Sequence, residues 1–371
     1  MGGPAVSWKD RTSATSFRFM RVSRATGYET DMIRVLKGGS ITRNNDVRIM
    51  ETAEAELVGS LNVGPDFIRV YMDASWPSGE TESVVLGTFL PVIPSRDVKH
   101  GYSRAKVKMY GRLQELLDDK FSSPVTLAKG TNAVDAAVSV CEQQGLEVIA
   151  DPSDFTISDV RMYGLGAQQN NSSVGDTKLD MVNNLLDLAG FRAAKTDPMG
   201  RILMKRYADP MSIAPSWSFE EGPMAKFESD MTDERDITSA ANHVVVRYES
   251  EGEIIVGEAY DTDPASDLST VSRGRVITRT YEYTSLPEGE TASDRQAYAN
   301  QRAQTLLSTA QATIRRITLT HPYAPITVND TCTVSYKSGG VEGLFEVRVQ
   351  KLSLTGGCPV NAEIRQFRRN G

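Results

Sequence analysis

The spacing of apolar residues changes twice along this chain, and that change limits its possible folds more than any other feature. Up to about residue 118, short segments alternate apolar and polar residues with a period near two, as half-buried antiparallel strands require. Examples are 17–19, 67–71 and 105–109. Turn-forming residues separate such segments at 37–40, 44–46, 64–66 and 77–79. Residues 1–118 are therefore predicted to form a β-barrel or sandwich, closed by a short helix.

From about residue 119 to 215 the spacing becomes helical. One helix is expected to begin after the capping residue Asn132 and to end at Gly145. A second is expected to begin after Asp176 or Thr177 and to end at Gly190. Strands are expected after each helix, at 146–149 and at 191–194, the second paired with 201–204 through a turn. This stretch is predicted to be a small α/β unit.

Strands are expected again from residue 216 onward, with 242–248 the most apolar. The polar, acidic stretch 249–287 is predicted to be a long surface loop around one or two edge strands. A capping box at 293–296 is expected to open a helix with Ala299, Ala303, Leu306 and Ala310 on its inner face. Four strand-like segments follow, at 317–319, 332–336, 345–349 and 352–354, with a hairpin turn at 338–340.

The predicted fold class is thus mainly β with an α+β insertion. At 371 residues the chain exceeds what one hydrophobic core usually supports. The predicted units are a first β-barrel at 1–118, an α/β unit at 119–215, and a second barrel with a long acidic loop and one helix at 216–371. No clear residue-level repeat relates the two barrels.

Composition excludes some classes of protein. Hydrophobic residues make up 40% of the chain and charged residues 24%, which argues against a disordered or collagen-like protein. The net charge of −7 has the wrong sign for broad binding to nucleic acid phosphates. Neither a secretory signal nor a membrane span is visible, so synthesis in a cytoplasm is the expectation.

Several turn and core elements follow one another in a characteristic order from about residue 16 to 368. They are 38–41, 86–89, 110–113, 116–119, 130–134, 185–191, 242–246, 263–266, 320–322, Asp330 and 343–345. In this order they resemble the hub proteins at the tip of tailed bacteriophage tails, especially minor tail proteins of long-tailed siphophages. None of them is a chemical signature, so their order carries the resemblance.

This resemblance implies two barrels related to the tail-tube protein on either side of the α/β unit. It also implies a homotrimeric hub of the virion that terminates the tail tube, adapts six-fold to three-fold symmetry and forms part of the genome ejection conduit. The implied partners are distal tail or tail-tube proteins, tail fibre or tip proteins and the tape-measure protein. Phage DNA is expected to pass through the lumen without specific binding.

No catalytic, cofactor-binding or metal-binding residue is predicted. The histidines, His100, His243 and His321, occur in no metalloprotease or triad spacing. The cysteines, Cys141, Cys332 and Cys358, form no zinc motif and are interpreted as small buried apolar residues. The chain contains 48 acidic residues, so no particular carboxylate pair can be singled out as glycosidase acids.

Weaker motifs favour ordinary explanations. The acidic segment 261–267 lacks the glycine and glutamate of a calcium loop and is interpreted as a solvated turn. The pair Gly164 and Gly166 lacks the remainder of a phosphate-binding loop. The glycosylation-type motifs at Asn170, Asn171 and Asn329 imply nothing without a secretion signal.

Two alternative functions remain open at the level of sequence. A receptor-binding protein could stack sugar rings on Trp8, Trp76 or Trp217, although packing or a subunit contact explains these residues better. A cell-wall hydrolase is the other alternative.

For the hub function, the arm 1–15 and the loop 249–287 are the candidate interface elements. Two interpretations of the acidic residues stay open: they line the lumen and repel DNA, or they serve solubility alone.

Overall fold

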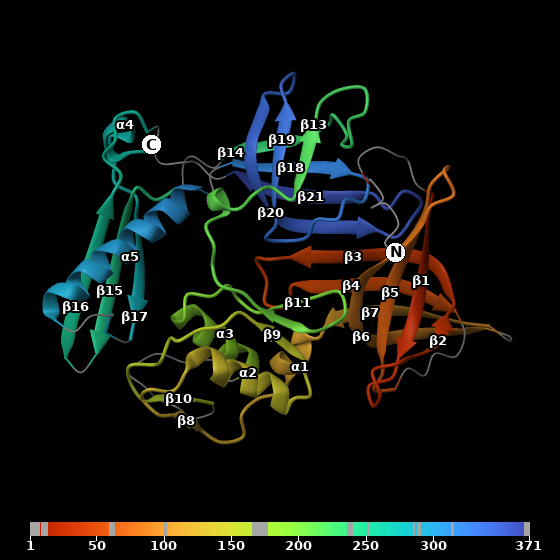
Figure 1. Cartoon of the computed structure of the whole chain (residues 1–371), viewed down its shortest axis with the longest axis horizontal. Coiled ribbons are helices and arrows are strands. Elements are labelled where there is room, and N and C mark those ends of the chain that lie inside the picture. Colours follow the sequence, from red (N-terminus) through yellow and green to blue (C-terminus); the bar gives the residue numbers. More distant parts are fainter. Residues whose placement is uncertain are drawn as a thin grey trace.

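The computed structural model describes residues 8, 14–58, 64–99, 102–164, 177–235, 240–250, 252–266, 268–284, 286–287, 291–312 and 315–366. Within these residues the chain is mainly β (Figure 1). Most of the arm 1–15 lies outside the described residues. So do His100, Gly166, Asn170 and Asn171.

A first β unit contains seven strands, coloured red to orange in Figure 1. They are β1 (Ala14–Val22), β2 (Glu29–Ile33), β3 (Val35–Asn44), β4 (Glu51–Val58), β5 (Phe67–Ser75), β6 (Thr81–Lys99) and β7 (Tyr102–Gly111). Their antiparallel order is β3-β4-β7-β6-β5-β1-β2. The sheet bends so that β1 and β5 cross the direction of β3 and β4 (Figure 1). Phe19, Leu57 and Phe89 lie in the core that it encloses.

A second β unit lies beside the first, at the top of Figure 1. Its strands are β13 (Trp217–Glu220), β14 (Thr232–Arg235), β18 (Arg315–His321), β19 (Thr331–Tyr336), β20 (Val341–Ser353) and β21 (Val360–Gln366). The order is β14-β18-β21-β20-β19-β13, and only β13 and β19 run parallel. The expected turn at 338–340 joins β19 to β20, with Gly340 at φ +68°.

One strand joins the two β units. β20 pairs with β3 across the boundary, so both units share a continuous sheet. Phe345 and Val347 on β20 pack in the core of the second unit. Leu352, farther along the same strand, packs in the core of the first unit together with Val360 of β21. The C-terminal strands therefore complete both cores.

An α+β insertion follows the first β unit. It contains α1 (Leu113–Asp118), β8 (Val125–Leu127), α2 (Ala133–Gln143), β9 (Val148–Ala150), β10 (Arg161–Tyr163), α3 (Lys178–Leu188), β11 (Lys195–Thr196) and β12 (Ile202–Met204), followed by the 3-10 turn Pro210–Ser212. Asn132 caps α2 by accepting hydrogen bonds from two backbone amides, and Thr177 caps α3 through its hydroxyl. Both caps confirm the sequence predictions.

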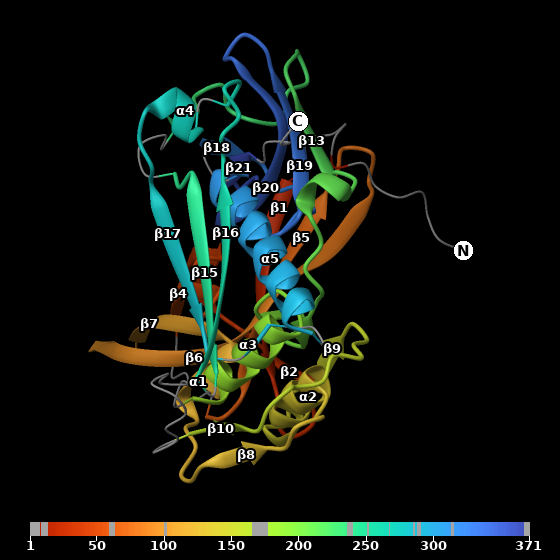
Figure 2. The ribbon, with the colours of Figure 1, turned by 90° about the vertical axis from the view of Figure 1, so that its left-hand side faces the viewer.

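A three-stranded sheet and a long helix form what we call the α5 unit, at the left of Figure 1. Its elements are β15 (His243–Ser250), β16 (Glu253–Tyr260), α4 (Thr270–Arg273), β17 (Thr278–Tyr283) and α5 (Ala292–Ala312). Helix α5 runs along the sheet and buries Val244, Val246 and Leu307 between them (Figure 2). Gly257 permits this close approach, because a Cβ there would lie 2.2 Å from the Ala299 carbonyl oxygen.

The prediction of a long acidic loop at residues 249–287 was wrong, because β16, α4 and β17 occupy most of that stretch. The one or two edge strands expected there are confirmed, since β16 and β17 flank β15 as the edge strands of a separate sheet. The helix cap was also misplaced by two residues: Thr291 and Asp294 form the capping box of α5. The segments 345–349 and 352–354 belong to one bulged strand, β20, and β21 was missed.

The prediction of a mainly β fold with an α+β insertion is confirmed. The division of the chain into units at residues 118 and 215 stays a prediction.

Candidate functional site

Charged side chains are buried where the insertion meets both β units. Arg43 on β3 and Glu51 on β4 are 5% and 6% exposed, with Nε and Oε1 3.7 Å apart. The Thr196 hydroxyl of β11 donates a 2.5 Å hydrogen bond to Glu51. Arg43 also donates a 2.7 Å bond to the carbonyl oxygen of Leu86. These contacts hold side chains from separate parts of the chain against one another.

Lys195 and Asp330 lie beside this pair, and we call Arg43, Glu51, Lys195 and Asp330 the junction. Lys195 Nζ donates a 3.3 Å hydrogen bond to the carbonyl oxygen of Val328, in the loop before β19. Burial raises the pKa of the Glu51 and Asp330 carboxyls and lowers the pKa of the Lys195 amine. The charge of Arg43 opposes the rise in the pKa of both carboxyls. The junction is therefore held by mutual pairing of poorly solvated groups.

A second group of charges, the arginine cluster, consists of Asp46, Arg192, Glu346, Arg348 and Arg365. Arg192 of the insertion lies 2.5 Å from Glu346, and Arg348 lies 3.2 Å from the other oxygen of the same carboxylate. Asp46 accepts hydrogen bonds from Arg348 and Arg365. Burial of Asp46 opposes ionisation, yet these two guanidinium groups hold the pKa of Asp46 below its ordinary value. The cluster fixes the insertion and both β units in one arrangement.

The large sheet has open edges at β2, β13 and β14 within the described residues. Tyr28, just before β2, and Met32 on β2 are 76% and 64% exposed. A strand with an open edge offers unpaired backbone donors and acceptors to another chain. These edges are therefore candidate assembly surfaces.

The two described histidines lie in different units and form no common site. His243 stacks on Tyr260 with ring centroids 3.8 Å apart, and its Nδ1 lies 2.9 Å from the Thr278 hydroxyl. His321 is buried against Phe219, 4.9 Å between ring centroids. Its Nδ1 lies 2.6 Å from the carbonyl oxygen of Pro322, so a proton on Nδ1 makes that hydrogen bond.

His321 predicts a pH dependence of stability. Burial lowers the pKa of His321 from 6.5 to about 4. The unfolded chain then binds more protons than the folded chain between these two pH values, so stability falls as pH falls through that window. We expect His321→Phe, which suits the apolar contact with Phe219, to remove a loss of about 3 kcal/mol between pH 6.5 and 4. Urea unfolding of both proteins at several pH values measures the difference. Parallel curves over this window would contradict the assignment to His321.

The cysteines are all buried and free. Burial raises the pKa of each thiol to about 12, which keeps Cys141, Cys332 and Cys358 protonated at neutral pH. No group of three or more potential metal ligands occurs in the described part of the chain. None of the helices in that part has the length and hydropathy of a transmembrane helix.

The acidic segment 261–267 forms a hydrogen-bonded turn up to its last described residue. Asp261 accepts from the Asp263 amide at 3.1 Å and from the Ser266 hydroxyl at 2.7 Å, and Asp263 accepts from the Ala265 amide at 2.8 Å. These bonds account for the acidic residues as turn formers. Asn329 serves the arginine cluster, since its side-chain oxygen accepts a 2.8 Å bond from Arg192.

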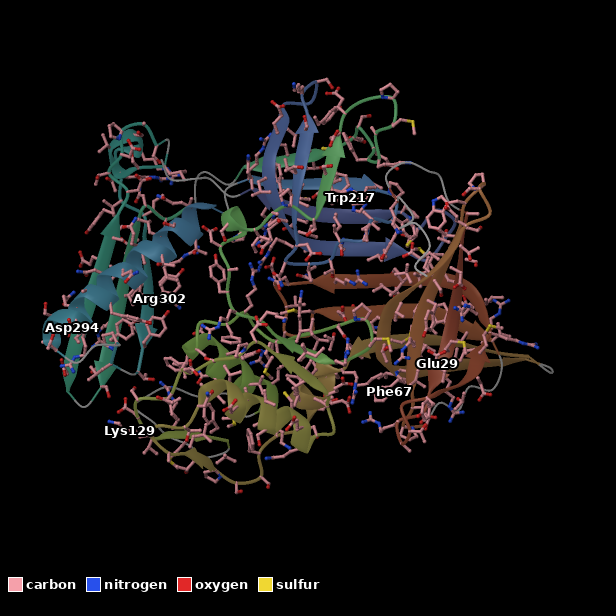
Figure 3. The ribbon with its side chains drawn as sticks, in the orientation of Figure 1. Glu29, Phe67, Lys129, Trp217, Asp294 and Arg302 are labelled. Carbon is pink, nitrogen blue, oxygen red and sulfur yellow. The ribbon has the colours of Figure 1, made fainter. Side chains whose placement is uncertain are left out.

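The tryptophans pack inside the molecule. Trp76 and Trp217 are 4% and 7% exposed, and Trp217 lies within the second β unit (Figure 3). Trp8 contacts both Trp76 and Tyr323 edge-on, with ring centroids 4.9 Å apart in each case. Trp8 therefore attaches the N-terminal segment where the two β units meet. This burial favours the packing explanation over sugar stacking for Trp76 and Trp217.

The sequence predictions missed the junction and the arginine cluster. Their members come from segments up to 319 residues apart, as Asp46 and Arg365 show. Some members share a segment, as Glu346 and Arg348 do, but the partners that connect the insertion to the β units are far apart in the sequence, so no local spacing identifies these groups. Asp46 was noted only as part of the turn at 44–46, and Asp330 only as one element of the family resemblance.

Known structures resemble this fold over nearly its whole length. A tail protein from Neisseria meningitidis MC58 aligns with a TM-score of 0.64 and 14% identity, covering 95% of this chain and 97% of its own. The 43 kDa tail protein of prophage MuSo2 from Shewanella oneidensis gives 0.59 and 12%, covering 95% and 98%. Prophage tail protein gp18 from Listeria monocytogenes EGD-e gives 0.52 and 12%, covering 95% of each chain.

No protein-family model and no curated protein sequence matches this chain. At 12–14% identity the likeness shows the fold. This chain therefore has the fold of phage tail proteins. The resemblance inferred from the order of turn and core elements is confirmed at that level.

Proposed function

We propose that this chain is a structural virion protein of a phage tail tip, a homotrimeric hub that terminates the tail tube. The observation that carries the proposal is the likeness of 95% of the chain to tail proteins of three bacteria, with nearly all of each relative covered. A likeness over whole chains argues for a shared architecture more strongly than a shared motif does. The role proposed is architectural, with no enzymatic step.

The two β units supply the reason for a trimer. Three copies of a chain with two β units present six such units around one axis, which matches a six-fold tube while keeping three-fold symmetry. The shared sheet through β3 and β20 keeps the two units of one chain at a fixed spacing. The open edges at β2 and β14 are suitable for pairing between neighbouring copies.

The partners follow from this position in the virion. Distal tail or tail-tube proteins contact one face of the hub, and tail fibre or tip proteins contact the other. The tape-measure protein and the genome pass along the axis. The net charge of −7 disfavours adhesion of DNA to the lumen during ejection. The hub is made in the host cytoplasm and works at the tip of a long, non-contractile siphophage tail.

The first test is the mass of the purified chain in solution, alone and mixed with tail-tube or distal tail protein, followed by averaging of ring images in electron micrographs. The expected result is a three-fold ring with six lobes. A chain that stays monomeric at high concentration, and forms no ring with those proteins, contradicts the proposal.

The edge strand β2 has its own test. Tyr28→Lys combined with Met32→Lys is expected to shift the ring toward monomers, because the added charges oppose edge pairing. Val271→Lys on α4 replaces a similarly exposed residue outside the large sheet and serves as the matched control. Circular dichroism of each variant establishes that the fold is retained. A ring that tolerates the double change excludes β2 as the subunit contact.

A further inference from the structure

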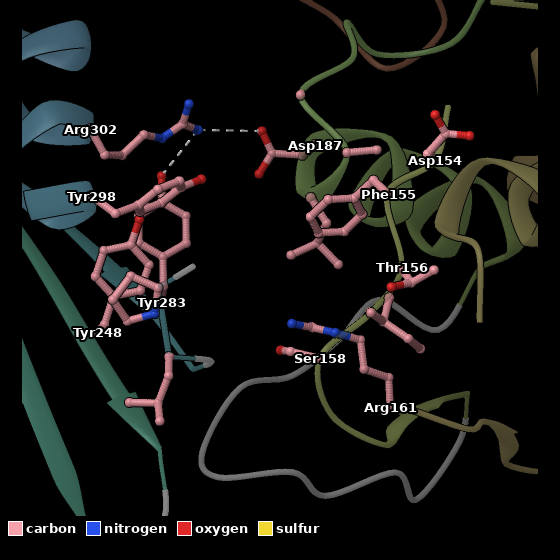
Figure 4. A pocket seen from close by; sticks show the side chains of 16 residues that line it. Asp154, Phe155, Thr156, Ser158, Arg161, Asp187, Tyr248, Tyr283, Tyr298 and Arg302 are labelled. Carbon is pink, nitrogen blue, oxygen red and sulfur yellow. Dashed lines mark hydrogen bonds and ion pairs between the residues drawn. The ribbon is translucent and has the colours of Figure 1, made fainter. Parts of the chain in front are cut away.

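A cleft of about 510 Å³ lies between the insertion and the α5 unit. Figure 4 shows its two walls facing each other across open space. Phe155, Ser158 and Arg161 belong to the insertion wall, whereas Tyr283 and Tyr298 come from β17 and α5. This volume falls within the range of about 300–1,000 Å³ that is typical of small-molecule sites.

The α5-unit wall is aromatic. Tyr248 stacks on Tyr283 with ring centroids 4.9 Å apart and ring planes 18° from parallel. Tyr298 meets Tyr248 edge-on at 6.5 Å. Tyr248 is buried and contacts both other rings, while Tyr283 and Tyr298 are partly exposed and line the cleft with it. Large, rigid ring faces with hydroxyl groups at their edges are thus presented to a ligand.

The charges around the cleft are balanced. Asp154 and Asp187 carry negative charge, and Arg161 and Arg302 carry positive charge. Arg302 and Asp187 approach to 3.9 Å and connect the two walls. With no excess of cations, the cleft has little electrostatic preference for a phosphate or another polyanion. An uncharged ligand suits it better.

One polar group in the wall lacks a partner among the described residues. The Nε atom of Arg161 is buried and donates to no hydrogen-bond acceptor there. An unpaired buried donor costs free energy, and a ligand oxygen that reaches it restores the lost hydrogen bond.

We infer that this cleft binds a neutral saccharide. The apolar C–H face of a sugar ring packs on the rings of Tyr283 and Tyr298. Its hydroxyl groups exchange hydrogen bonds with the planar carboxylates and guanidinium groups of the rim, including Arg161. The binding site does not depend on the hub proposal, since it lies within one chain.

The test uses isothermal titration calorimetry of the whole chain with two neutral probes, tri-N-acetylglucosamine and maltotriose. Trigalacturonate and inorganic phosphate are the charged comparators. Saturable binding of at least one neutral trimer, at least tenfold tighter than either charged comparator, is expected. Equal or tighter binding of a charged comparator, or no binding of either neutral trimer, overturns the inference.

Variants locate the binding. Tyr298→Ala is expected to weaken it at least tenfold, whereas Tyr260→Ala, an exposed stacked ring on the same sheet but outside the cleft, leaves it unchanged. Ser158→Trp fills the space from the opposite wall without touching the core, so it tests occupancy even if Tyr298→Ala fails to fold. Binding that survives Ser158→Trp, or that Tyr260→Ala reduces as much as Tyr298→Ala does, places the sugar elsewhere and overturns the inference.

Discussion

Replacing Glu346 with alanine is expected to lower the free energy of unfolding by about 3 kcal/mol. Glu346 is 2% exposed and lies between the guanidinium groups of Arg192 and Arg348. Removing one partner of a buried ion pair costs about 3–5 kcal/mol, because the remaining charge stays buried without compensation. The lower end applies because both arginines keep partial access to water. Urea unfolding at pH 7 measures the loss.

The matched control for this prediction is Glu342→Ala. Glu342 lies on the same strand, β20, but its side chain is exposed. Its removal is expected to change stability by less than about 0.5 kcal/mol. Similar losses in the two variants would show that the arginine cluster contributes no more than a surface charge does.

The second large effect is expected for Leu352→Ala, at about 2–5 kcal/mol. Leu352 is buried in the core of the first β unit, although it belongs to a strand of the second. Truncation leaves a cavity in a core whose other members come mostly from β1 to β7, more than 240 positions earlier. Both β units are expected to lose stability together, in a single transition, because β20 contributes to both cores.

Tryptophan fluorescence separates the two units. Trp8 is replaced by Phe in both reporters, because it packs against both cores. In the Leu352→Ala background, Trp217→Phe then leaves Trp76, next to β5 of the first unit, and Trp76→Phe leaves Trp217 in the second. The two urea transitions are expected to coincide. Lys351→Ala, an exposed neighbour, is the control. If Leu352→Ala lowers the urea midpoint reported by Trp76 but leaves the midpoint reported by Trp217 unchanged, the two units unfold independently.

The sequence predicted those elements whose ends are fixed by neighbouring residues, such as the capped helices α2 and α3. The caps at Asn132 and Thr177 were predicted because a side-chain oxygen next to a helical pattern satisfies backbone donors wherever the helix packs. The strand β17 was obscured because most of its side chains reach solvent. The strand β16 has an apolar, alternating pattern with Ile254, Ile255 and Val256, but the acidic residues around it led to its interpretation as part of a loop.

The junction and the cleft depend on residues that come together only in the folded chain. Arg43 and Glu51 flank a predicted turn, and nothing in that segment indicates that Thr196 lies against them. The cleft was missed for the same reason. Its walls come from residues 154–190 and 248–302, and no spacing relates them. The order of turn and core elements was informative because it reflects the whole topology.

Because β20 and β21 contribute to both cores, the core of the first unit is completed only late in synthesis. The ribosome releases β1 to β7 roughly 240 residues before Leu352 and Val360, a delay of roughly 10–50 s at ordinary elongation rates. During that interval the first unit has an unfinished core and an unpaired β3 edge. A nascent or truncated chain thus lacks a complete first unit. Only chains that include β20 and β21 have the complete core of the first unit.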